Sequence, residues 1–199
     1  GVQDAVDFIA TLRQTPDLSA LPVGRRVVVI GGGMTAVDAA VQSKLLGAEE
    51  VHMVYRRGPE TMSASTAEQE WAQTNGVVLH QWLAPVEILG RDGSVCAVRF
   101  AEQAMVGGKL QATGREITFE ADTVLKAIGQ KLGNPVLAAA GLALDGGRIQ
   151  TDAEGTTNLP GVWAGGDCRA GGLDLTVEAV EHGKQSANAI HAYLTSAKA

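Results

Sequence analysis

Residues 27–36 of this 199-residue chain read Val27-Val28-Val29-Ile30-Gly31-Gly32-Gly33-Met34-Thr35-Ala36. The continuous β-branched run is typical of a central parallel strand that is buried on both faces. A glycine turn follows at once, and apolar residues then recur at helical spacing from Met34 to Leu46. The pattern Gly31-x-Gly33-x-x-Ala36 therefore lies between a strand and a helix, the setting in which it predicts dinucleotide binding.

The residues of this turn have distinct physical roles in holding a pyrophosphate. Gly31 permits the tight turn, Gly33 lets a phosphate approach the backbone, and small Ala36 lets the helix pack closely on the strand. The helix N-terminus adds unpaired N–H groups and the positive end of its dipole. The alternative is a strand, turn and helix with a structural role alone.

The flanking sequence predicts a parallel sheet. A helix at about 4–13, whose apolar stripe begins at Val2, precedes the central strand. Further strands are expected at 51–55, 77–79 and 123–128. A capping box formed by Ser65 and Glu68 predicts the start of the helix between the second and third strands. This order favours right-handed crossovers and a sheet with helices on both faces.

The pattern changes after residue 80. Short strands separated by turn residues predict a β-meander laid on the sheet, at 86–89, 95–100 and 117–119. Beyond it we expect a short helix near 135–140, a strand near 162–164 and a long helix from about 175 to 194. The predicted fold class is α/β, a three-layer Rossmann-like nucleotide-binding domain with a β-meander.

The end of the second strand carries two arginines in place of an acid. An NAD-binding domain usually places Asp or Glu there, to accept a hydrogen bond from the ribose 2′-hydroxyl. Tyr55-Arg56-Arg57 offers forked donors and positive charge, which suit a 2′-phosphate. The pair favours NADPH over NADH, with Arg56 the nearer to the strand. Solvated loop charges are the alternative interpretation.

Composition and charge exclude several classes of partner. Acidic residues outnumber basic ones 22 to 16, giving a net charge of -6, so the chain repels nucleic acid backbones. No apolar run approaches the length of a membrane span. Cys96 and Cys168 match neither a disulfide framework nor a metal-site spacing. We expect a cytoplasmic protein with no metal site and no nucleic-acid or membrane partner.

A second signature lies near the C-terminus, where residues 157–167 end in Gly165-Gly166-Asp167 after a short apolar run. Here the chain resembles the flavin reductases that contain two dinucleotide-binding domains. The resemblance implies that Asp167, preceded by Gly166, accepts a hydrogen bond from the ribityl chain of FAD. It also implies that Thr176-Val177 begins a helix pointing at the flavin pyrimidine ring, and that Ile128-Gly129 lies in the crossover between domains.

Within that family, the likeness is nearest to the small subunit of bacterial glutamate synthase and the flavoprotein part of dihydropyrimidine dehydrogenase. Residues 31–38 and 54–62 carry it, although Ser63 stands where many relatives have proline. The likeness implies that NADPH, or the NADH that some relatives use, reduces FAD. Electrons then pass through iron–sulfur clusters in an upstream segment or a partner. The expected partner is a larger subunit, either pyrimidine-reducing or, alternatively, the large subunit of glutamate synthase.

The resemblance also implies domain boundaries. It places the end of a flavin-domain segment at 1–20, the nicotinamide-binding domain at 21–126, and the C-terminal part of a discontinuous FAD-binding domain at 127–199. Relatives carry a cysteine-rich segment and a first FAD fingerprint upstream, so we expect this chain alone to be inactive. Hydride transfer between two cofactors needs no catalytic acid or base from the protein.

Two other functional classes fit the sequence to different degrees. A non-catalytic NAD(P)-binding module remains an alternative. A simple dehydrogenase with its own substrate pocket is disfavoured, because neither Tyr55 nor Tyr193 begins the Tyr-x-x-x-Lys pattern that would supply a proton donor.

Overall fold

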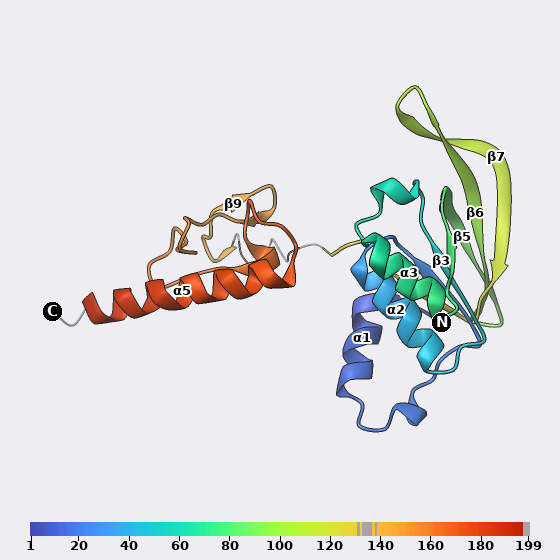
Figure 1. The fold of residues 1–199 in the computed structure, drawn as a ribbon, viewed down its shortest axis with the longest axis horizontal. Helices are drawn as coiled ribbons and strands as arrows, with labels where there is room; N and C mark the ends of the chain where they lie inside the picture. The colour runs from blue at the N-terminus through green and yellow to red at the C-terminus, as the bar shows by residue number, and fades with distance from the viewer. Residues whose placement is uncertain (131, 133–136, 138, 197–199) are drawn as a thin grey trace. The chain divides into compact units, whose positions relative to one another are not determined.

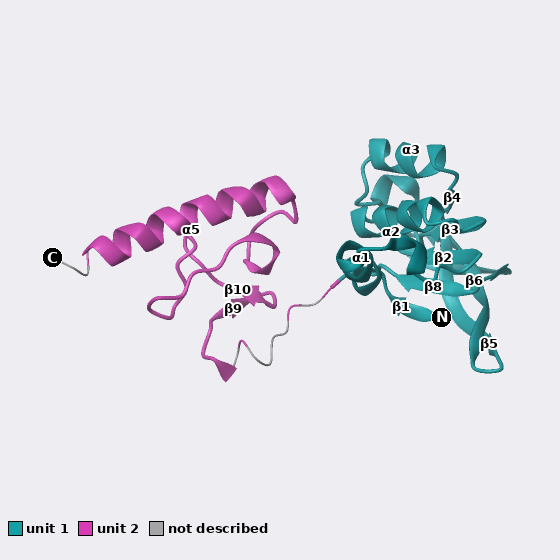
Figure 2. Ribbon diagram, turned by 90° about the horizontal axis from the view of Figure 1, so that it is seen from below, with its two compact units in different colours: residues 1–129 teal, residues 130–199 magenta. Residues whose placement is uncertain are grey.

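The computed structural model describes residues 1–130, 132, 137 and 139–196. The chain divides into two compact units, 1–129 and 130–199 (Figures 1 and 2). Strand β1 (Val2–Asp4) and helix α1 (Ala5–Gln14) belong to unit 1, where they join its sheet and its helical layer. The assignment of 1–20 and 127–199 to a flavin domain stays a prediction.

A five-stranded parallel sheet forms the centre of unit 1, with the strand order β1-β8-β2-β3-β4. Its other members are β2 (Arg26–Ile30), β3 (Glu50–Val54), β4 (Val78–His80) and β8 (Thr123–Lys126). All four were predicted from the sequence. The predicted place of Val2 in a helical stripe was wrong: Val2 lies in β1 and pairs with Val124 of β8, and α1 begins only after Asp4.

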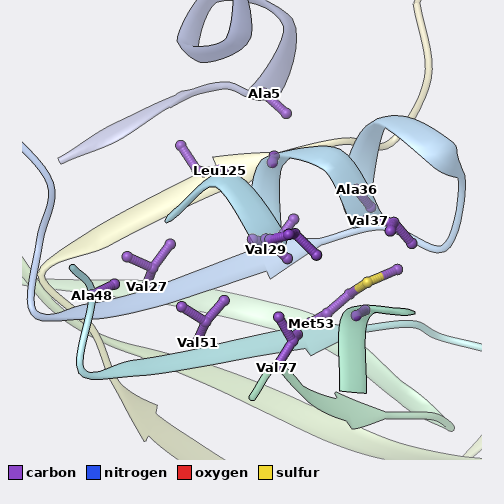
Figure 3. Packing of buried hydrophobic residues seen from close by; sticks show 14 of the residues in the cluster. Ala5, Val27, Val29, Ala36, Val37, Ala48, Val51, Met53, Val77 and Leu125 are labelled. Atoms are coloured by element: carbon purple, nitrogen blue, oxygen red, sulfur yellow. The ribbon is translucent and has the colours of Figure 1, made fainter. Parts of the chain in front are cut away.

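Three helices cover one face of this sheet: α1, α2 (Met34–Leu45) and α3 (Thr66–Thr74) (Figure 2). Successive residues of a strand point to opposite faces, so Val27 and Val29 of β2 share the helical side. Figure 3 shows them in one cluster with Val37 of α2 and Met53 of β3. The predicted capping box is confirmed at the start of α3, where it satisfies two backbone N–H groups.

An antiparallel meander covers the opposite face. It comprises β5 (Leu83–Arg91), β6 (Ser94–Val106) and β7 (Lys109–Glu120). Val28 and Ile30 of β2 pack there in a cluster with Val98 and Phe100, both fully buried. The prediction of helices on both faces was therefore wrong, because among the described residues the meander takes the place of a second helical layer. The α/β class, with a Rossmann-like sheet and a meander, is confirmed.

The meander strands are longer than the sequence predicted. β6 and β7 have 13 and 12 residues, and their distal halves form a ribbon that projects from the sheet (Figure 1). Gly107 and Gly108 close the ribbon with φ angles of +58° and +76°. Met105 and Val106, near its tip, are each 53% exposed. Since the ribbon has no buried face, its sequence lacks the alternation from which a strand is predicted.

Unit 2 contains one long helix and several short elements. Those described are β9 (Leu144–Asp145), β10 (Arg148–Ile149), the 3-10 helix η3 (Gly166–Cys168) and α5 (Thr176–Ser196). The prediction of the long helix is confirmed. The strand predicted near 162–164 was wrong, because an isolated bridge between Thr156 and Trp163 is the described pairing there. The helix predicted near 135–140 lies mostly outside the described residues.

The described helices differ in kind from membrane-spanning ones. None of them combines the length and the apolar character that such a span needs.

Two histidines face each other between the sheet and the meander. His52 Nδ1 of β3 lies 3.0 Å from His80 Nε2 of β4. Both rings contact Phe119 of β7, with centroids 4.8 and 4.5 Å apart. Burial lowers the pKa of His52, partly opposed by Glu50, whereas burial and the neighbouring His52 both lower the pKa of His80. The folded unit therefore favours the neutral form of both rings.

We expect unit 1 to lose stability on mild acidification. An unfolded histidine has a pKa of about 6.5. Because the folded pKa values lie lower, the unfolded state binds more protons below that pH and becomes favoured. The free energy of unfolding should therefore be independent of the pair above about pH 7, and should fall as the pH drops through about 6.5. Urea unfolding at a series of pH values measures this effect.

Two variants isolate the contribution of the pair. His52→Asn combined with His80→Gln should flatten the pH dependence, even if it lowers stability at neutral pH. His191→Gln, at an exposed position of α5, should leave the dependence unchanged. An equally steep loss of stability in the double variant would contradict the assignment.

Candidate functional site

The glycine turn lies at the carboxyl ends of three parallel strands. The Gly31 N–H donates to the carbonyl of Val54 in β3 (3.0 Å), and the Ala127 N–H, just after β8, donates to that of Ile30 (2.8 Å). Gly31 has φ = +155°, and a Cβ there would lie 2.3 Å from the Ala127 carbonyl oxygen. Only glycine fits this position, because a side chain would meet the backbone of Ala127, just after β8.

Gly32 is also constrained, which the sequence pattern did not indicate. A Cβ at Gly32 would lie 2.4 Å from a ring carbon of Tyr55, so the tyrosine ring packs directly against the turn. The Ala64 N–H donates to the Gly32 carbonyl (3.1 Å). The one signal in the sequence is the additional glycine at a position that Gly-x-Gly leaves free.

Helix α2 begins at this turn, with Gly33 as its N-cap and no side chain capping it. The Gly33 carbonyl accepts a hydrogen bond from the Ala36 N–H (3.0 Å), and Ala36 is fully buried. The N–H groups of Met34 and Thr35 precede the first intrahelical hydrogen bond, so they have no partner within the helix. Ser63 Oγ lies 2.9 Å from the place of a Gly33 Cβ. This helix start has the donors that bind an anion.

The loop after β3, residues 55–61, carries the arginine pair and is named the arginine loop. Arg56 and Arg57 are exposed, and within the described part of the chain neither guanidinium takes part in a hydrogen bond or an ion pair. The loop is not uniformly basic, because the Glu60 carboxylate lies 2.4 Å from the place of a Gly58 Cβ. Two donors for a phosphate and one acceptor for a ribose hydroxyl therefore lie in the same loop.

The carboxyl edge of the sheet thus combines several groups of the kinds that bind phosphates in other proteins. The turn and helix start at residues 31–36 supply backbone N–H groups and a helix dipole. The arginine loop supplies two guanidinium groups and is joined to the turn through the Tyr55 ring. The sequence predicted the turn and the arginines separately, and the structure shows the contact between them.

In unit 2, the Gly166-Asp167 turn packs on α5. The Gly166 N–H donates to His182 Nδ1 (3.2 Å), and Gly166 adopts φ = +70°. Asp167 is exposed, as is Thr176-Val177, the first two residues of α5. The residues predicted to contact a flavin therefore belong to one compact unit and are accessible within it.

Two side chains that the sequence did not place in the site support this turn. Glu178 accepts a hydrogen bond from the Leu173 N–H, and its Oε1 lies 3.7 Å from His182 Nε2. Because His182 Nδ1 accepts from Gly166, the neutral ring carries its proton on Nε2, on the side of Glu178. The spacing of four residues, which puts Glu178 and His182 on one helix face, is the signal that could have found them.

The predicted crossover residues lie next to the glycine turn. Ile128-Gly129 directly follows Ala127, which contacts Gly31; Ile128 is 74% exposed.

Within the described residues, no cluster of three His, Cys, Asp or Glu side chains is placed to hold a metal ion. Cys96 and Cys168 are free thiols.

Comparison with known proteins gives matches along nearly the whole chain. A family model for pyridine nucleotide-disulphide oxidoreductases matches residues 1–183. The glutamate synthase (NADPH) small chain of Escherichia coli is 35% identical, over 86% of this chain and 39% of that protein. The NAD-dependent dihydropyrimidine dehydrogenase subunit PreT of Salmonella typhimurium is 32% identical, over 98% of this chain and 43% of that protein.

The fold is also found among solved structures. Thioredoxin reductase of Lactococcus lactis superposes with a TM-score of 0.75 at 24% identity, covering 98% of this chain and 58% of that one. This chain spans between 25% and 43% of the length of the curated relatives that it matches. The resemblance inferred from the sequence is confirmed by these matches.

Proposed function

The chain belongs to the pyridine nucleotide-disulphide oxidoreductase family, and from this premise we propose that it binds NADPH or NADH as part of a flavoprotein oxidoreductase. The glycine turn is the observation that carries the proposal. Gly31, Gly32 and Gly33 carry no side chains of their own, and they lie at the carboxyl edge of the sheet. In open α/β sheets this edge is where ligands bind, so the residues present fit a dinucleotide.

The residues of unit 1 would bind and orient the nucleotide. The N–H groups of Met34 and Thr35 hold its pyrophosphate, and Gly33 leaves room for it. Arg56 and Arg57 bind the 2′-phosphate of the adenosine ribose. When bound, the nicotinamide and flavin rings supply a hydride chemistry that side chains do not provide.

We further propose that unit 2 contributes to a flavin site in the complete protein. Asp167 accepts a hydrogen bond from the ribityl chain, and His182 and Glu178 hold the turn that carries it. The start of α5 at Thr176-Val177 directs its dipole at the pyrimidine ring. Ile128-Gly129 is proposed as the crossover between the two cofactor sites.

The acceptor beyond the flavin is proposed from the relatives. Both curated relatives described above are named as a small chain or subunit. We propose that electrons leave through iron–sulfur clusters outside these residues to a larger, pyrimidine-reducing subunit. The alternative is the large subunit of glutamate synthase. NADPH oxidation by the full-length protein, assayed with each partner and either uracil or glutamine plus 2-oxoglutarate, separates the two.

A non-catalytic NAD(P)-binding module is the remaining alternative, because the turn alone would suffice to bind nucleotide without turnover. Reduction of an artificial dye by the full-length protein separates the two functions. Dye reduction driven by NADPH or NADH supports the oxidoreductase, and nucleotide binding without it supports the module.

The choice of nicotinamide cofactor gives a quantitative prediction. Arg56→Ala or Arg57→Ala should weaken NADPH binding about tenfold to hundredfold, since each removes a charged hydrogen-bond donor to phosphate. NADH lacks the 2′-phosphate, so its affinity should change far less. Calorimetric titration of both cofactors at one ionic strength measures the two dissociation constants.

Arg13→Ala is the matched control. Arg13 is exposed in the last turn of α1 and carries the same charge. It should leave both affinities unchanged. Equal affinities for NADPH and NADH in the parent chain would defeat the 2′-phosphate assignment. In that case Glu60→Gln should weaken NADH binding, because Glu60 is the acceptor that remains in the loop.

A further inference from the structure

The arginine loop is closed at its base by a tyrosine. Tyr55 Oη donates a hydrogen bond to the Thr61 carbonyl (2.8 Å). The single proton of Thr61 Oγ1 is shared between two acceptors, Tyr55 Oη (3.3 Å) and the Gly58 carbonyl (3.0 Å). These contacts link Tyr55 with Thr61, at the two ends of the segment that contains Arg56 and Arg57, and Thr61 with Gly58 inside it.

Backbone hydrogen bonds and a ring contact link the same loop to neighbouring segments on both sides. On one side the Tyr55 ring lies against Gly32, and the Ala64 N–H donates to the Gly32 carbonyl (3.1 Å). On the other side the Trp82 N–H donates to the Arg57 carbonyl (3.1 Å). Trp82 has φ = +60°, a left-handed conformation that is uncommon for a non-glycine residue. The backbone of the arginine pair is thus linked to the glycine turn, while neither guanidinium has a hydrogen-bond or ion-pair partner among the described residues.

We propose that Tyr55 is a positioning residue that sets the specificity of this site for a 2′-phosphate. The inference rests on the proposed function. An arginine side chain loses much rotamer freedom when it binds a phosphate, and a fixed backbone lowers the entropy that binding must overcome. The hydroxyl of Tyr55 fixes the loop, and the ring joins the loop to the turn that holds the pyrophosphate. One residue therefore sets the spacing between the two phosphate-binding groups.

Tyr55→Phe tests this role because it keeps the ring on Gly32 and removes the hydroxyl that bonds Thr61. The affinity for NADPH should fall about fivefold, the effect of one net hydrogen bond. The affinity for NADH should stay within about twofold of the parent, so the NADPH-to-NADH ratio changes. Tyr193→Phe, a half-exposed tyrosine of α5, is the matched control and should alter neither affinity.

A double-mutant cycle distinguishes positioning from a general effect on the fold. In an Arg56→Ala/Arg57→Ala background, Tyr55→Phe should have no further effect on NADPH binding, since there are no arginines left to position. An unchanged NADPH-to-NADH affinity ratio in Tyr55→Phe would overturn the inference, whether the variant weakens both cofactors equally or weakens neither.

The same titrations distinguish a failure of the proposed function from a failure of this inference. A parent chain that binds neither nucleotide overturns the proposed function, and the inference falls with it. A parent chain that prefers NADPH and loses the preference in the arginine variants, but keeps it in Tyr55→Phe, overturns the inference alone.

Discussion

Replacing Gly31 with alanine is expected to lower the free energy of unfolding by about 3 kcal/mol and to abolish binding of NADPH and NADH. Alanine would be strained at φ = +155°, and its Cβ would lie 2.3 Å from the Ala127 carbonyl oxygen. The hydrogen bond from the Ala127 N–H to Ile30 joins the two segments at this point. The turn must therefore separate from the end of β8, which displaces the start of α2.

Gly47→Ala separates the effect of conformation from that of close approach. Gly47 follows Leu46, the C-cap of α2, with φ = +105°, and a Cβ there would meet no atom within 4 Å. Gly47→Ala should lower the free energy of unfolding by about 1 kcal/mol and leave nucleotide binding intact. Urea unfolding followed by circular dichroism, with calorimetry of NADPH binding, compares the two variants. Equal losses of stability would contradict the importance of the close approach at Gly31.

Phe100→Ala is expected to lower the free energy of unfolding by about 3–5 kcal/mol, the usual loss when a large buried side chain is removed. Phe100 is fully buried between the parallel sheet and the meander, in a cluster with Val28, Val54 and Val98. Its ring centroid lies 5.7 Å from that of Phe119. Removing it leaves a cavity at the junction of two layers, where neither sheet can relax without the other.

Met105→Ala is the matched control on the same strand, because Met105 is 53% exposed in the projecting ribbon. It should change stability by less than about 0.5 kcal/mol. Equilibrium unfolding in urea gives both values. A loss below about 1 kcal/mol for Phe100→Ala would mean that the meander is not part of the core of unit 1.

The sequence predicted the part of the fold that local signals determine. The β-branched run of β2, the glycine turn and the helical spacing of α2 are contiguous, and each has its own period. The capping box at Ser65 and Glu68 likewise needs only four residues. These elements were found because their geometry does not depend on distant contacts.

The meander of unit 1 was predicted from the sequence. That it takes the place of helices on one face was not predicted, because this arrangement depends on tertiary packing. The distal ribbon of β6 and β7 is exposed on both sides, so no pattern marked it. Val2 was counted in the apolar stripe of the first helix because its spacing fits that of α1, whereas pairing with β8 makes it a strand residue.

The candidate site was likewise predicted only in part. The glycines and arginines follow from the chemistry of phosphate binding, which the sequence displays. The contact of Tyr55 with Gly32, and the support of Gly166 by His182, join residues 23 and 16 positions apart in the chain. Such contacts need the fold before they can be seen.

The central claim is that a dinucleotide lies over the start of α2, beside the arginine loop. Titration of the isotope-labelled chain with NADPH, followed by amide chemical shifts, tests it most directly. We predict that the amides of residues 31–36 and 55–57 shift together and saturate at the dissociation constant measured by calorimetry. Saturable binding that leaves these amides unchanged while others shift would contradict the account.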